Sequence, residues 1–181
     1  MPSQLKIDSL TYCYKYEPAN KKNMMLFAGI EGLLSGIQQE SPDRSLTFLF
    51  FFKENIRELL PMLEVRQVYK RHIIISDSVM LPLAYFFASR NRALCIIEPT
   101  DTVQAAQEKL THCFTTGNEY DVYLSSLKST HLKIFHNFFS GIDANSISLK
   151  VGVSLKRTYG IRKEVENQLG ITVRKLQSCS L

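Results

Sequence analysis

The segment "SISLKVGVSLKRTYGIRKEVENQLGI", residues 146–171, contains two short helical patterns joined by Val-Gly-Val-Ser. Gly152 is suited to the end of the first helix, because glycine adopts the left-handed backbone conformation without steric cost. Ser154 is suited to cap the second helix, because its hydroxyl can accept a hydrogen bond from an amide of the first turn. Two helices joined by a short turn that contains glycine are typical of a helix-turn-helix.

The residues before this segment also follow a helical pattern, from Leu127 onward. Ser129 or Thr130 is expected to cap this helix, and Gly141 stands where a glycine commonly ends one. Its apolar side chains form one stripe, made of Ile134, Phe135, Phe138 and Phe139. Asp143 is expected to cap the next helix. The sequence therefore predicts an all-helical region that continues into the helix-turn-helix.

The helix after Ser154 has one apolar face and one polar face. At 100° per residue, four side chains fall within about 80° of one another and form the expected core stripe: Thr158, Ile161, Val165 and Leu169. The opposite face carries Lys156, Tyr159, Gly160, Lys163 and Asn167. Arg157 and Arg162 lie on either side of that outer face, where phosphate strands would run beside a helix in a major groove.

The first part of the chain alternates between strand and helix patterns. The expected strands are 10–15, 46–52, 72–76 and 92–98. The expected helices are 23–37, 53–65, 80–91 and 101–114, the last capped by Thr100 or Asp101. Such alternation predicts an α/β region with a mostly parallel sheet that helices cover on both faces. The polar stretch "TTGNEYD", 115–121, is a natural break after it.

The charge of the chain is unevenly distributed. Of its 181 residues, 124–181 hold nine Lys/Arg and three Asp/Glu, a net charge of +6, whereas the other 123 residues total −1. A basic segment beside a near-neutral one suggests a polyanionic partner, although a basic tail can also serve solubility alone. No apolar run approaches the roughly 20 residues that span a bilayer. The four cysteines lack paired spacing, which favours reduced thiols in a cytoplasmic protein over metal ligands.

Three segments resemble the C-terminal helix-turn-helix of the LuxR/NarL/FixJ family of bacterial transcription regulators. They are "LKSTHLKIFHNFFSG" (127–141), "SISLKVGVS" (146–154) and "KRTYGIRKEVENQLGI" (156–171). Carried over by position, the resemblance implies base contacts from Tyr159, Gly160 and Lys163. It implies phosphate contacts from Ser154, Lys156, Arg157 and Arg162. The sequence departs from the family at His131, Arg157, Ile161 and Gln168, where Glu, Thr, His and Lys are usual.

In such regulators a receiver domain often precedes the helix-turn-helix, and residues 10–114 look like a shortened version of one. A receiver that is phosphorylated needs an Asp after its third strand, and "LTFLFFFKEN" has none. Glu98 stands where a receiver has a Lys after its last strand. We therefore expect a receiver-like domain without a phosphoacceptor over 1–116, a linker over 117–124, and the helix-turn-helix domain over 125–181. One βα unit of the receiver is expected to be missing between residues 38 and 46.

Taken together, these patterns predict a cytoplasmic, DNA-binding transcription regulator that inserts the helix 154–168 into the major groove. It is expected to act on double-stranded DNA as a homodimer, or as a heterodimer with a related regulator, without membrane, cofactor or metal. The alternative is a co-regulator or anti-regulator that binds another transcription factor without contacting DNA. An enzyme is not expected: Asp77 is read as a helix cap, and His131 and His136, five residues apart, are read as solvated or half-packed.

Overall fold

The computed structural model describes residues 46–64, 71–91, 93–116, 119 and 125–179, together with Gly29 and Gly32. The strand expected at 10–15, and the βα unit expected to be missing between 38 and 46, lie outside the described residues. The helix expected at 23–37 does so too, except that Gly29 and Gly32 are helical. The linker expected at 117–124 is likewise outside, apart from Glu119.

A three-stranded parallel sheet lies at the centre of the described α/β part. Its strands β1 (Leu46–Phe51), β2 (Arg71–Ser76) and β3 (Ala93–Ile97) pair in the order in which they occur along the chain. Phe and Ile dominate these strands because helices cover both faces of the sheet and, among the strand side chains whose exposure is described, leave almost none exposed. The expected parallel sheet is confirmed for these three strands.

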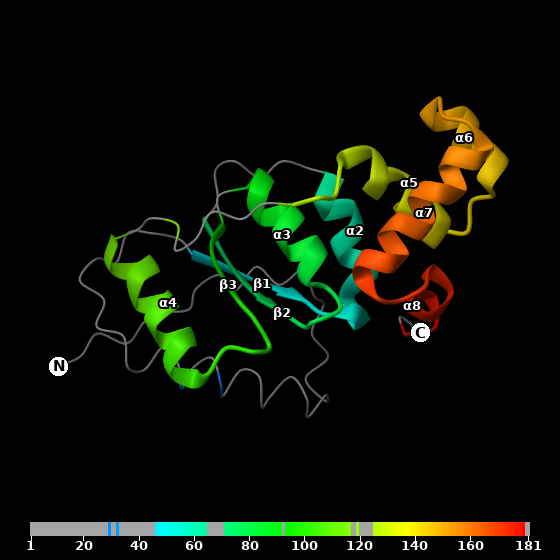
Figure 1. The fold of residues 1–181 in the computed structure, drawn as a ribbon. Coiled ribbons are helices and arrows are strands. Elements are labelled where there is room, and N and C mark those ends of the chain that lie inside the picture. Colours follow the sequence, from blue (N-terminus) through cyan, green and yellow to red (C-terminus); the bar gives the residue numbers. More distant parts are fainter. Residues whose placement is uncertain are drawn as a thin grey trace.

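One face of the sheet is covered by two helices (Figure 1). A single 3-10 turn, η1 (Lys53–Asn55), leads into α2 (Ile56–Glu64), and α3 (Leu81–Arg90) follows β2. Asp77 begins this second crossover, and its carboxylate accepts hydrogen bonds from the amides of Lys53 and Met80, each at 2.8 Å. The expected role of Asp77 as a helix cap is wrong, because Met80 is the N-cap of α3 and α3 begins without a side-chain cap. Asp77 instead fixes the turn before the helix and ties the end of β1 to the end of β2.

The opposite face is covered by α4 (Val103–Thr116), which packs Ala106, Leu110 and Cys113 on the sheet. A hydrogen bond with Cys113, together with burial, raises the pKa of the Cys95 thiol. The expected caps of α4, Thr100 and Asp101, are wrong. Thr102 caps the helix, because its hydroxyl accepts from the Ala105 amide at 3.1 Å while the Asp101 carboxylate is held by other donors.

Four further helices lie at one end of the molecule, beyond α2 and α3 (Figure 1). They are α5 (Ser129–Phe139), α6 (Ala144–Val151), α7 (Leu155–Leu169) and α8 (Val173–Cys179). The expected side-chain cap of α5 is wrong: Ser129 accepts from the Arg90 guanidinium at 2.8 Å instead, and α5 begins without a side-chain cap. None of the described helices is both long enough and apolar enough to cross a membrane.

The helical part and the α/β part share one hydrophobic core. Leu132 and Phe135 of α5, Leu169 of α7 and Leu176 of α8 belong to the same buried cluster as the side chains of α2 and α3. Polar contacts support the junction: His136 Nδ1 lies 2.8 Å from a carboxylate oxygen of Glu64. The described residues therefore form a mixed, mostly helical α/β structure whose two parts are packed against each other.

Candidate nucleic-acid interface

The helix pair α6–α7 is fixed by the local signals that its sequence carries. Asp143 accepts from the amides of Asn145 and Ser146, and the Ser146 hydroxyl and amide hold the pKa of Asp143 below its usual value. Gly152 ends α6 with φ of 72°, a conformation that side-chain-bearing residues rarely adopt. Ser154 then caps α7 by accepting from the Arg157 amide at 3.3 Å. These predicted caps and the glycine stop are confirmed.

The inner side of the pair is held by a small apolar cluster. Ile134 of α5, Ile147 of α6 and Ile161 of α7 are all buried against one another. The predicted core stripe of α7 is confirmed, because its four members are at most 3% exposed: Thr158, Ile161, Val165 and Leu169. The other side of α7 is therefore turned to solvent.

The outer face of α7 is open. Lys156, Lys163 and Asn167 are exposed, and Tyr159 retains 47% of its accessible surface. A methyl group added at Gly160 would meet no atom within 4 Å. Side chains and backbone on this face are thus accessible to a large partner.

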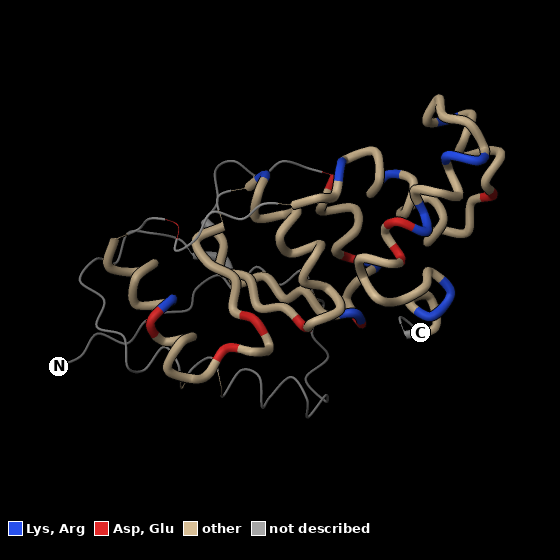
Figure 2. Tube along the Cα trace, viewed as in Figure 1, with Lys and Arg blue, Asp and Glu red and all other residues tan. Residues whose placement is uncertain are grey.

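The charged side chains on this face differ in whether they form ion pairs. Lys156 and Lys163 form no ion pair with any described residue. Arg157 donates to Glu164 at 2.8 Å, but its side chain is half-exposed and a guanidinium has further donors. Figure 2 shows Lys and Arg spread over α5–α8, with Asp and Glu around β3 and the start of α4 and, on α7, toward its C-terminal half at Glu164 and Glu166. The exposed face of α7 is therefore cationic.

Two helices contribute to an aromatic and cationic stack at the edge of that face. The rings of Phe138, on α5, and Tyr159, on α7, have centroids 6.0 Å apart. The central carbon of the Arg162 guanidinium lies 5.0 Å from the Phe138 centroid and 5.5 Å from that of Tyr159. Sequence reasoning placed Phe138 in the apolar stripe of α5 and missed this contact, because it depends on how two helices cross.

His131, where the resembling family usually has Glu, lies behind α7. The expectation that it is solvated or half-packed is wrong, since it is only 8% exposed. Its Nε2 lies 3.9 Å from a Glu164 oxygen, which is too long for a hydrogen bond. Desolvation lowers the pKa of His131, opposed by Glu164 and reinforced by Arg157 and Lys128. His136, by contrast, is half-buried as expected.

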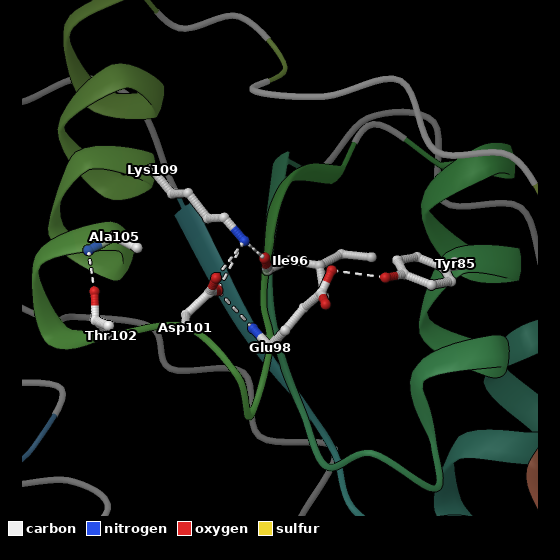
Figure 3. A network of polar contacts seen from close by, with 7 residues as sticks. All are labelled: Tyr85, Ile96, Glu98, Asp101, Thr102, Ala105 and Lys109. Carbon is white, nitrogen blue, oxygen red and sulfur yellow. Dashed lines mark hydrogen bonds and ion pairs between the residues drawn. The ribbon is translucent and has the colours of Figure 1, made fainter.

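A second candidate site is the edge of the sheet where β3 ends (Figure 3). Glu98 accepts from the Tyr85 hydroxyl at 2.6 Å. Asp101 accepts from the Glu98 amide at 2.8 Å and from Lys109 at 2.7 Å, and Lys109 also donates to the Ile96 carbonyl. Each acidic side chain in this network is engaged by a neighbour within the chain. The network therefore ties β3, α3 and α4 together at an edge where parallel sheets often bind ligands.

Two exposed leucines were not anticipated from the sequence. Leu149, on α6, is 85% exposed, and Leu155, at the start of α7, is 41% exposed. Both lie outside the stripes that the helical period assigns to the core. The sequence could have revealed them, because neither leucine falls at a position that the helical period assigns to the core. Apolar side chains left in solvent are candidates for contact with a partner.

The described residues thus offer one open cationic surface on α7 and one internally satisfied polar network beside β3. Comparisons of the chain with protein-family models, with curated proteins and with solved structures found no match.

Proposed function

We propose that this chain is a DNA-binding transcription regulator in which a receiver-like α/β part carries a LuxR-type helix-turn-helix. The observation that carries the proposal is the outer face of α7, where Lys156 and Lys163 are exposed and form no ion pair with a described residue. An unpaired cation has no internal partner to give up when it neutralises a DNA phosphate and releases counterions, or when it donates to a base edge.

In the proposed complex, α7 lies in the major groove. Lys163 donates to the O6 and N7 acceptors of guanine, and the Tyr159 hydroxyl meets a neighbouring base edge. Gly160 allows the helix backbone to approach the bases, because no side chain stands between them. Base reading is thus assigned to Tyr159, Gly160 and Lys163.

Phosphates are proposed to bind around the start of α7. The Ser154 cap leaves other first-turn amides without an intrahelical partner, and these attract anions together with the helix dipole. Lys156 and Arg157 stand in the same turn, where cations are slightly unfavourable in the free helix. A phosphate strand along this turn would relieve that repulsion, which supports the assignment.

The α/β part is proposed to serve contacts between proteins. This part resembles a receiver domain but has no Asp at the end of β1, where Phe52 and Lys53 stand. A homodimer, or a heterodimer with a related regulator, would have to use a surface other than the apolar side of α8. Val173 and Leu176 of that helix are already buried within this chain.

The test is selection of duplexes from a random library by the purified chain, followed by titration of the selected duplex against salt. We expect a preferred sequence and a steeply negative salt slope. Lys163→Ala should weaken binding to that duplex by about 1–3 kcal/mol and relax the preference at one position. Lys133→Ala removes an exposed lysine of α5 outside this face and should change binding far less. An unchanged profile in Lys163→Ala would refute the base-reading assignment.

A second candidate function is a co-regulator that binds another transcription factor without touching DNA. The exposed Leu149 and Leu155 favour it, because two apolar side chains beside a cationic face suit an acidic, amphipathic partner. A flat salt slope with every duplex would support this candidate. Retention of the DNA preference by Leu149→Ser, together with a steep slope, would support the DNA-binding proposal instead.

A further inference from the structure

We propose that Phe138 is a positioning residue for base recognition, acting through a stack in which it holds Tyr159 and Arg162. The inference rests on the proposed DNA binding and deepens it. In it, Arg162 keeps Tyr159 in place, rather than gripping a phosphate as its position on the helical wheel predicts. The specificity of the outer face would then depend on a residue of α5, a helix that need not touch the bases.

The contacts of Arg162 carry the first step. Its guanidinium lies over both rings, at 5.0 Å from Phe138 and 5.5 Å from Tyr159, and its side chain is only 38% exposed. Its Nε is buried without a hydrogen-bond partner and lies 3.8 Å from Glu166. A guanidinium so placed lies against two rings and has one nitrogen shielded from solvent, so less of it remains for a phosphate.

Glu166 lies beside Arg162 and is itself fixed by the backbone. Its Oε1, the same atom that lies near Arg162, accepts from the Val173 amide at 2.9 Å at the start of α8. The carboxylate is therefore fixed by the backbone and cannot swing away with the arginine. Contacts of Phe138, Arg162 and Glu166 thus connect α5, α7 and α8 next to Tyr159.

The consequence concerns the direction of the Tyr159 hydroxyl. A tyrosine free in solvent samples several rotamers, and each would place its hydroxyl near a different base. Contact with both Phe138 and Arg162, which also contact each other, restricts Tyr159 before DNA binds. A pre-ordered side chain discriminates between bases better, since less freedom is lost on binding.

The planar shape of arginine gives a sharp test. Lysine keeps the positive charge of Arg162 but cannot stack flat on a ring or form the same fork. If Arg162 contacts phosphate, Arg162→Lys should leave the base preference intact. If Arg162 positions Tyr159, the same variant should flatten that preference while the salt slope stays the same.

The experiment uses the full chain and the duplex selected by the wild type, with single base-pair variants of that duplex. Tyr159→Ala first identifies the base pair whose discrimination depends on the tyrosine. Phe138→Leu and Arg162→Lys should each reduce the affinity ratio at that same base pair by about fivefold or more, with a nearly unchanged salt slope. Phe138→Tyr keeps the ring and should retain the ratio, and Lys133→Ala serves as the matched control.

The outcomes separate the inference from the proposed function. If the wild type prefers a duplex but Phe138→Leu and Arg162→Lys keep the full ratio, the stack has no role in recognition, while DNA binding stands. If the wild type binds no duplex preferentially, both the role of the stack and the proposed DNA binding are refuted. Thermal unfolding checks that Phe138→Leu remains folded. Should it unfold, the half-exposed Arg162→Lys decides alone.

Discussion

The pKa of His131 links one side chain to the stability of the whole chain. Burial lowers this pKa below 6.5, and the opposing attraction of Glu164 acts across 3.9 Å without a hydrogen bond. The unfolded chain therefore binds a proton at His131 more readily than the folded chain. By linkage, the contribution of His131 to the free energy of unfolding is fully present above pH 6.5, where the imidazole is neutral in both states. This contribution is lost as the pH falls through the pKa of His131 in the folded chain.

His131→Gln should remove this part of the pH dependence. Glutamine has a similar reach but does not titrate, so the variant should lose less thermal stability than the wild type between about pH 7 and pH 5. The measurement is the unfolding temperature of both proteins across that range. Curves that run parallel would show that His131 is not desolvated in the folded state.

At the scale of elements, Gly160 lowers the stability of α7, because it lies inside the helix. Glycine inside a helix costs roughly 0.5–1 kcal/mol relative to alanine, and an added methyl would meet no atom within 4 Å. Gly160→Ala should therefore stabilise the free chain by up to about 1 kcal/mol, which thermal unfolding would detect.

The same substitution should weaken DNA binding, because the methyl group would stand where the backbone approaches the bases. Stability and affinity are thus expected to change in opposite directions. A variant that gains stability and keeps full affinity would show that the helix does not approach the groove closely at Gly160.

The sequence predicts elements well where the deciding contacts are local. Asp143 and Ser154 bond to amides two or three residues away, and the core stripe of α7 follows from the helical period alone. The prediction fails where a distant residue competes. The Ser129 hydroxyl accepts a hydrogen bond from Arg90, 39 residues away, and the Asp101 carboxylate accepts one from Lys109, so neither caps a helix.

The candidate site shows the same division. The exposed face of α7 could be read from the 3.6-residue period, because exposure on one helix depends on that helix and the side that it buries. The stack of Phe138, Tyr159 and Arg162 could not, because it requires the angle between α5 and α7. That angle is set by the apolar side chains packed beneath both helices, not by a motif.

At the scale of the molecule, the shared core makes the two parts interdependent. Phe135 of α5 is fully buried in a cluster that includes side chains of α2, α3, α7 and α8. The sequence suggested two domains because its composition changes near residue 115. Composition does not reveal that the apolar stripe of α5 faces α2 as well as its own helical neighbours.

Phe135→Ala should therefore destabilise both parts. Removal of a fully buried Phe side chain costs about 3–5 kcal/mol, which is a large share of the stability of a small protein. Hydrogen exchange of the amides of α3 and α7 should accelerate together, and thermal unfolding should remain a single transition at a lower temperature. Independent domains would behave differently: α7 would lose protection, whereas α3 and β3 would keep theirs. Leu110→Ala, in the cluster on the opposite face of the sheet, gives the converse test, because in a single cooperative unit it too must lower the protection of α7.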